Sequence, residues 1–208
     1  MSFDLWLTFA AASTALLILP GPTLLMVLSY ALTQGRRVAI ASALGVATGD
    51  FIAMSLSVIG LGALFLASAT AFTILKWAGA IYLIYLGLRM LRTPADQSAL
   101  MDKPSNTTAI KVFRDLTAVT ALNPKSNTFF IAFVPQFISP EAPFAPQAAI
   151  LVGTFVAIAA VNALVFALSA NAMRSRMTRP SVQNWLSKCG GLTLICMGFL
   201  TMTLRRST

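Results

Sequence analysis

The sequence lacks histidine and holds little cysteine and little charge. Among its 208 residues there is no histidine, only two cysteines, and 10% charged residues. Histidine is the commonest metal ligand and the commonest acid–base group near neutral pH. A soluble domain carries about 25% charged residues, so this chain has too few to cover a surface exposed to water. We therefore expect neither a soluble enzyme nor a metal or cofactor site.

The two cysteines give no redox signature. Cys189 and Cys196 lie seven positions apart in one apolar segment, which places them about 10 Å apart along a helix. That separation is too long for a disulfide, and the pair is not a CxxC motif. The chain also has no GxxxxGK[ST] motif, so it does not hydrolyse nucleotide by that route.

Long apolar runs dominate what the sequence does contain. Hydrophobic residues make up 57% of the chain, and a helix needs about 20 apolar residues to cross ~30 Å of hydrocarbon. Six segments meet this requirement, at residues 5–32, 38–67, 71–91, 116–138, 148–172 and 185–204. The sequence therefore predicts an all-α integral membrane protein whose main partner is the lipid bilayer.

Basic residues, which give a net charge of +9, indicate the orientation. Eleven lie in or next to the connections after spans one, three and five: Arg36, Arg37, Arg89, Arg92, Lys103, Lys111, Arg114, Arg174, Arg176, Arg179 and Lys188. Only Lys76, Arg205 and Arg206 fall on the other side. Because cytoplasmic loops carry the excess of Lys and Arg, we expect both termini outside the cytoplasm and no nucleic-acid partner. If one segment is re-entrant, the C-terminus changes side.

The two halves of the sequence resemble each other. The polar segment 93–115 separates a first unit, 1–92, from a second, 116–208. Gly49 and Gly153 stand 104 residues apart, as do Pro20 and Pro124. Three spans per unit would make the second unit enter the membrane from the opposite face. The predicted fold is thus six transmembrane helices in two inverted three-helix repeats, with helices one and four broken.

Proline and glycine interrupt the first and fourth spans at corresponding places. The first break is LPGPTLL, residues 19–25, and the second is NPK, residues 123–125. Paired breaks in inverted halves are typical of a substrate site near the midplane of the membrane. A proline kink that only shapes packing is the alternative. The candidate binding residues at the two breaks are Pro20, Gly21, Pro22, Asn123, Pro124 and Lys125.

Asp50 and Lys125 are ionisable residues deep in apolar sequence. Such residues usually face a cavity or each other, so they are either a transport site or a buried structural ion pair; a misplaced span end would instead make one of them interfacial. Gly49, next to Asp50, belongs either to the site or to a close helix contact. Asn162 and Gln136 are further polar candidates, and each could instead be an interhelical hydrogen-bond partner.

These motifs resemble those of the LysE/RhtB family of bacterial amino-acid exporters over nearly the whole chain. The similar segments are LPGPTLL, GVATGD, KWAGAIYLIYLGLRML and ALNPKSNTFFIAFVPQF. The resemblance implies export of amino acids or close derivatives across the bacterial inner membrane, coupled to an ion gradient, with protons expected. Many relatives have asparagine after Gly-Pro, whereas this chain has Thr23, so no one substrate carries over.

The residue types suggest how an amino-acid zwitterion could be held. Asp50 would bind its ammonium group, while Lys125 and a helix N-terminus would bind its carboxylate. Protonation of Asp50 from outside would then release the substrate. The alternatives are a membrane enzyme or electron carrier, a passive channel, and a non-transporting subunit of a membrane complex. A homodimer is compatible with the small size of the chain, and nothing in the sequence establishes it.

Overall fold

The computed structural model describes residues 1–19, 21–34, 38–92, 107–139, 142–177 and 180–203, and these form helices with no strand. The α-helices and one short 3₁₀ helix are α1 (Phe3–Ile18), α2 (Pro22–Gln34), α3 (Ala39–Ala67), α4 (Ala69–Arg92), α6 (Ala109–Ala121), α7 (Pro124–Ala132), η2 (Val134–Phe137), α8 (Phe144–Met177) and α9 (Pro180–Thr203).

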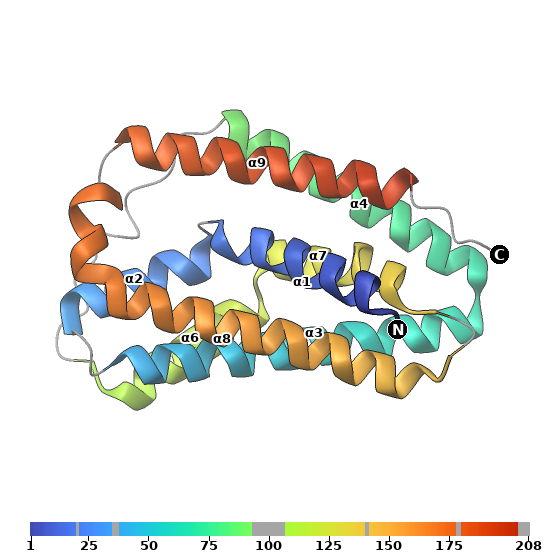
Figure 1. Ribbon diagram of the computed structural model, residues 1–208, viewed down its shortest axis with the longest axis horizontal. Coiled ribbons are helices and arrows are strands. Elements are labelled where there is room, and N and C mark those ends of the chain that lie inside the picture. Colours follow the sequence, from blue (N-terminus) through green and yellow to red (C-terminus); the bar gives the residue numbers. More distant parts are fainter. Residues whose placement is uncertain (20, 35–37, 93–106, 140–141, 178–179, 204–208) are drawn as a thin grey trace.

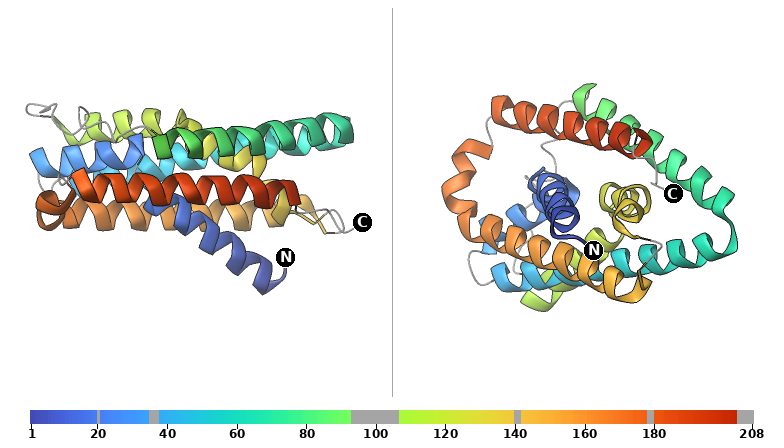
Figure 2. Two further views of the ribbon diagram at one scale, coloured as in Figure 1. Left: turned by 90° about the horizontal axis from the view of Figure 1, so that it is seen from above. Right: turned by 45° about the vertical axis from the view of Figure 1, so that its right-hand side comes forward.

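The helices form two outer groups, and in Figure 1 α1 and α7, one half of each broken helix, lie between them. In one group α3 packs against α6 and α8, and in the other α4 packs against α9. In Figure 2, α4 and α9 again run alongside each other and α7 lies within the assembly, while the N-terminal part of α1 projects from one side. The segments interrupted by LPGP and NPK are therefore central to the fold.

Not every expected span appears as a helix of membrane-crossing length and composition. Among the described residues, the segments Ala39–Ala63 and Phe144–Ala170 qualify as single helices. The pair formed by Phe3–Ile18 and Pro22–Leu32 qualifies together, as one broken span bent by 57°. These helices are consistent with a membrane protein, while six spans in inverted repeats stay a prediction.

The start of the fourth span differs from the expected one. Helix α6 begins at Ala109, seven residues before the expected start of span four, because the Thr108 side chain caps it by accepting from the Lys111 N–H at 3.4 Å. Its first turns are amphipathic, with Val112 buried and Lys111 exposed. A hydropathy average does not detect this start, because an amphipathic turn contains polar as well as apolar residues. Most of the 93–115 connection lies outside the described residues.

Glycines allow the tightest helix contacts. A Cβ atom placed on Gly49 of α3 would lie 2.6 Å from the Thr120 Cβ and 2.7 Å from the Thr117 carbonyl oxygen of α6. On the other side of the fold, a Cβ on Gly87 of α4 would lie 2.5 Å from the Gly191 carbonyl oxygen of α9. Small residues let membrane helices approach this closely, so Gly49 serves packing between α3 and α6.

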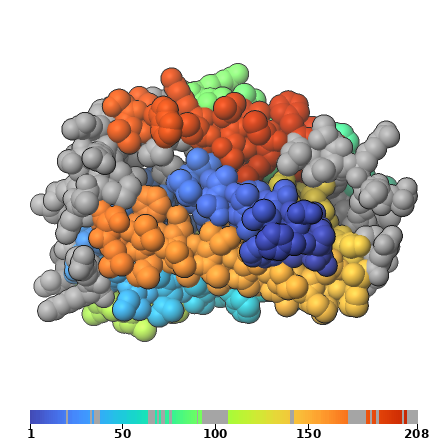
Figure 3. Space-filling view, in the orientation of Figure 1, coloured from blue at the N-terminus to red at the C-terminus, as the bar shows by residue number. Residues whose placement is uncertain are grey.

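The outer faces are apolar, and the few polar groups turn inward. Large exposed side chains include Phe3 and Leu7 on α1, Val165 on α8, and Trp185 and Phe199 on α9. Figure 3 shows one of the outer faces, on which α1 lies between α8 and α9. The buried set includes Asp50, Asn123, Thr120 and Ser126. This distribution suits a surface that faces lipid.

Candidate functional site

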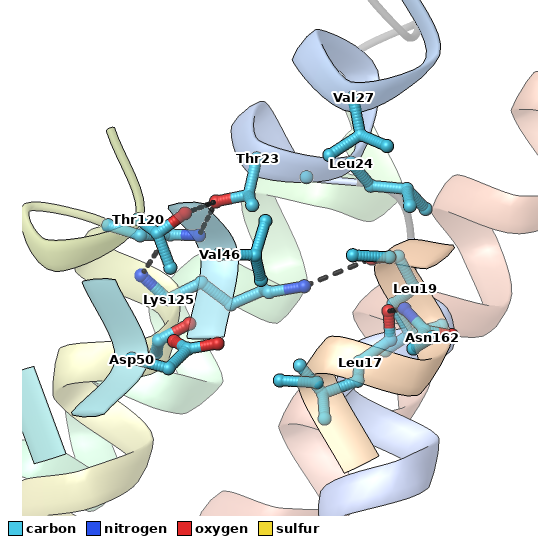
Figure 4. Close-up of a pocket in the computed structure, with 15 residues that line it drawn as sticks. Leu17, Leu19, Thr23, Leu24, Val27, Val46, Asp50, Thr120, Lys125 and Asn162 are labelled. Carbon is cyan, nitrogen blue, oxygen red and sulfur yellow. Dashed lines mark hydrogen bonds between the residues drawn. The ribbon is translucent and has the colours of Figure 1, made fainter. Parts of the chain in front are cut away.

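A cavity lies where the two helix breaks meet (Figure 4). Its walls come from both breaks and from α3, α6 and α8. The lining residues are Leu17, Leu19, Gly21, Thr23, Leu24, Val27, Val46, Asp50, Thr120, Asn123, Lys125, Ser126, Ala159, Asn162 and Ala163. The volume is about 30 Å³, room for about two waters at ~10–15 Å³ each. An amino acid would need the walls to move apart.

Asp50 supplies the buried acid of the site. It lies on α3, one residue after the glycine that packs against α6, and it is 1% exposed. Its Oδ1 atom has no hydrogen-bond partner among the described residues. No ion pair within 4.0 Å joins it to Lys125. The simple structural ion pair is therefore absent in this conformation.

Lys125 reaches away from α7 to the end of α1. Its Nζ atom donates to the Leu19 carbonyl oxygen at 3.0 Å and to the Leu16 carbonyl oxygen at 3.1 Å. The last four carbonyls of a helix have no intrahelical donor, and this end of α1 carries partial negative charge. Gly21 leaves space for the lysine, since a Cβ there would lie 3.3 Å from Nζ.

Asn162 of α8 supports the same helix end. Its Nδ2 atom donates to the Leu17 carbonyl oxygen at 3.1 Å. Asn162 and Lys125 thus hold three neighbouring carbonyls of the first break from two different helices. Asn162 is thus an interhelical hydrogen-bond donor, as the alternative had it, and it also lines the cavity. The expected role in substrate binding stays a prediction.

The second break is closed by its own residues. The Leu122 N–H donates to the Ala118 carbonyl at 3.0 Å, and the Asn123 N–H donates to the Thr120 carbonyl at 3.1 Å. The Asn123 side chain then caps α7 by accepting from the Lys125 N–H at 3.0 Å. Pro124 occupies the first turn of α7, where a missing N–H costs nothing.

Thr23 joins the two breaks. Asn123 Nδ2 donates to Thr23 Oγ1 at 3.1 Å, and the Thr120 hydroxyl lies 3.4 Å from the same oxygen. Thr23 stands where the resembling family often has asparagine, and it was noted in the sequence only for that departure. Thr120 and Ser126 also line the cavity. A weak signal for them existed, because both lie within one helical turn of NPK.

The structure brings together part of the expected set. Gly21, Asp50, Asn123, Lys125 and Asn162 line the cavity. Four other expected residues do not: Gly49, Pro22, Pro124 and Gln136. Pro20 lies outside the described residues.

Gln136 is placed farther along the chain, in η2. Its Nε2 atom donates to the Ala132 carbonyl at 3.3 Å and to the Thr201 carbonyl at 3.5 Å. Helix α7 lies between the NPK break and η2, and η2 begins ten residues after Pro124. Gln136 is therefore too far along the chain to reach the cavity. Its contacts are those of a helix–helix link.

Phenylalanines fill the space between α1, α7, η2 and α8. Their ring centroids lie 4.8 to 6.5 Å apart, and the members are Phe9, Phe129, Phe130, Phe133, Phe137 and Phe155. All are nearly or fully buried. This aromatic cluster is part of the buried core beside the cavity, and none of its members lines the cavity itself.

Comparison with known proteins agrees with the membrane architecture. Residues 14–205 match the LysE type translocator family. The chain belongs to this family. Its members are transporters, so the protein is a translocator and not an enzyme. Within the described part of the chain, no three His, Cys, Asp or Glu side chains come together as a metal site.

Full-length relatives are also found. The chain is 34% identical over 209 residues to the homoserine/homoserine lactone efflux protein of Salmonella typhimurium, covering all of both chains. It is 30% identical over 203 residues to an uncharacterized membrane protein of Vibrio cholerae serotype O1, covering 98% of each. No solved structure is significantly similar to the chain.

Proposed function

We propose that the protein is a secondary-active exporter of amino acids or close derivatives, working as a proton-coupled antiporter. The relatives named as efflux proteins for homoserine and homoserine lactone support this substrate class, since they align over their full length. Membership of the translocator family supports transport itself.

One observation carries the proposal: the cavity offers groups of both polarities at the two breaks. Asp50 and the carbonyl end of α1 are suited to an ammonium group, and Lys125 is suited to a carboxylate. Gly21, the residue before the first residue of α2, has no side chain that could cap this helix. The N–H groups at the N-terminal end of α2 add a second place for negative charge.

We place this site in six spans arranged as two inverted three-helix repeats. The contacts of α3 with α8 and of α4 with α9 support that arrangement, because each pair would unite corresponding helices of the two repeats. The C-terminal turn of α4, with Arg89 and Arg92, points toward the end of the bundle at which α6 starts, and the N-terminus of α1 lies toward the other end (Figure 1). The positive-inside rule then puts the termini outside the cytoplasm.

The proposed cycle couples Asp50 to the outer proton. An unpaired buried carboxylate is costly, so Asp50 binds a proton when no cation lies beside it. Substrate loads from the cytoplasm as Asp50 releases this proton inward. Opening the aromatic cluster exposes the site to the outside, where a new proton enters and the substrate leaves. The repeats rock around the fixed site.

Efflux from proteoliposomes tests the proposal. Liposomes loaded with radiolabelled homoserine, homoserine lactone or other amino acids are given a pH gradient, acidic outside when the protein is oriented as in the cell. We expect gradient-stimulated release that Asp50→Asn reduces to the background of protein-free liposomes, while a control variant at an exposed position, Asp4→Asn, retains it.

The alternatives give other results in the same assay. A passive channel would release substrate equally with and without the gradient, and a non-transporting subunit would release nothing. Normal gradient-driven efflux by Asp50→Asn would end the role given to this carboxylate.

A further inference from the structure

The C-terminal end of α1 is an acceptor site built into the cavity. The carbonyls of Leu16, Leu17 and Leu19 accept hydrogen bonds from side chains. The donors are Lys125 and Asn162. The helix macrodipole adds partial negative charge at this end. In membrane carriers, the C-terminal ends of broken helices are places where cations are coordinated.

A primary ammonium group already occupies this acceptor site, on Lys125. An ammonium group has three donors, and two of them are used on the Leu16 and Leu19 carbonyls at 3.1 and 3.0 Å. The lysine takes this position although Asp50, a carboxylic acid lining the same cavity, has an unpartnered oxygen. In this conformation the lysine is held by the helix end and not by the acid.

The backbone of Lys125 is held in place, while its side chain has free space along its length. Asn123 caps the first turn of α7 and so fixes the lysine backbone. Beyond the backbone, the side chain passes Gly21, where a Cβ would meet its Cε at 3.5 Å and its Nζ at 3.3 Å. The chain can therefore swing without crossing a side chain at position 21.

We propose that the carbonyl end of α1 is the subsite for the primary ammonium group of the substrate, and that Lys125 occupies it in the empty carrier as an internal competitor. This rests on the proposed function only for the identity of the natural occupant. An incoming amino acid displaces the Lys125 ammonium from Leu16 and Leu19. Because the two charged groups of an α-amino acid are adjacent, the released lysine meets the substrate carboxylate nearby. Asp50 is then left to carry the proton.

Chemical rescue by small amines tests this subsite without measuring transport. Lys125→Ala vacates the carbonyls, and the full-length variant is studied in detergent at fixed pH and ionic strength. We expect ammonium, methylammonium and ethylammonium chloride to raise its Tm saturably, by about 2–4 °C at a few times the dissociation constant. Tetramethylammonium has no N–H donor and should give no shift.

Matched controls separate the subsite from a general salt effect. Wild-type protein, with the subsite filled, and Lys111→Ala, which removes an exposed lysine at the start of α6, should show no amine-dependent shift. If Lys125→Ala does not purify folded, Lys125→Met removes the donors while keeping side-chain length, and ammonium, the smallest probe, replaces the series.

No shift in the folded variant, or an equal shift in wild type or with tetramethylammonium, would overturn the proposal. The readout is unfolding temperature and not flux. The ammonium subsite can therefore be refuted by this test while the efflux assay still supports the proposed function. The subsite can also be supported in a protein whose efflux does not depend on the gradient.

Discussion

At the α6–α7 break the backbone bonds to its own neighbours, whereas at the α1–α2 break it depends on side chains from α7 and α8. Leu122 and Asn123 return to carbonyls of α6, and Asn123 caps the next helix. The carbonyls that end α1 instead accept from Lys125 and Asn162.

This difference separates a fixed part of the site from an exchangeable one. At the second break the Leu122 and Asn123 N–H groups bond to carbonyls of the preceding helix, so we expect these bonds to remain when the cavity is occupied. At the first break the carbonyls accept from side chains of other helices, which under our proposal an ammonium group of the substrate can displace. The second break therefore positions Lys125, and the first break provides the place where it competes.

The largest expected loss of stability comes from disturbing the contact between α3 and α6, next to the second break. Gly49→Ala would drive a methyl group to 2.7 Å from the Thr117 carbonyl oxygen, so α3 and α6 must separate. Overpacking of this kind costs about 1–3 kcal/mol, or a fall in Tm of several degrees at about 2–4 °C per kcal/mol. Thermal unfolding in detergent measures it.

Gly153 on α8 is the matched control, 104 residues farther along the chain. A Cβ there meets nothing within 4 Å. Gly153→Ala should therefore leave the Tm unchanged or raise it slightly, because alanine favours helix over glycine by roughly 0.5–1 kcal/mol. Equal losses in both variants would contradict a special contact at Gly49.

A smaller effect is expected from removing the cap of α7. Asn123→Ala deletes the acceptor for the Lys125 N–H, 3.0 Å away, and cap loss costs about 1 kcal/mol. Asn123→Ser keeps a cap acceptor of similar strength but loses the amide donor to Thr23. We expect a fall of about 2–4 °C in Tm for alanine and a smaller one for serine. If the two variants fell equally, the link to Thr23 and not the cap would hold the break.

The sequence predicted both breaks and five of the residues that line the cavity, Gly21, Asp50, Asn123, Lys125 and Asn162. Pro124 and the LPGP motif forbid continuous helix through local chemistry, so the ends of α1 and α6 were readable. The charges of Asp50 and Lys125 marked the cavity, because burial of charge in an apolar segment needs a reason.

The partner of Lys125 was not readable from sequence. Its acceptors are backbone carbonyls more than 100 positions away, and every residue carries a carbonyl, so no residue type signals them. Hydropathy likewise could not tell that Gln136 lies past the end of α7. The length of a helix after a proline depends on tertiary packing, here by Phe129 and Phe133.

The smallest expected effect is the energetic coupling between Lys125 and Asn162, the two side chains that donate to the end of α1. Lys125→Ala and Asn162→Leu each leave carbonyls without a donor. Once one variant has loosened the helix end and admitted water, the other should cost less. We expect the double variant to lose about 0.5–1 kcal/mol less than the sum of the single losses, measured as shifts in Tm.

The control cycle pairs Asn162→Leu with Gly153→Ala on the same helix. These positions are nine residues apart, about 13 Å along α8, and Gly153 touches nothing at the break. Their effects should add within ~0.3–0.5 kcal/mol. Additivity in both cycles would mean that Lys125 and Asn162 hold separate structures and that the first break is not one exchangeable site. Coupling in the first cycle alone would identify the end of α1 as a single acceptor group, which is the property that a ligand competing with Lys125 requires.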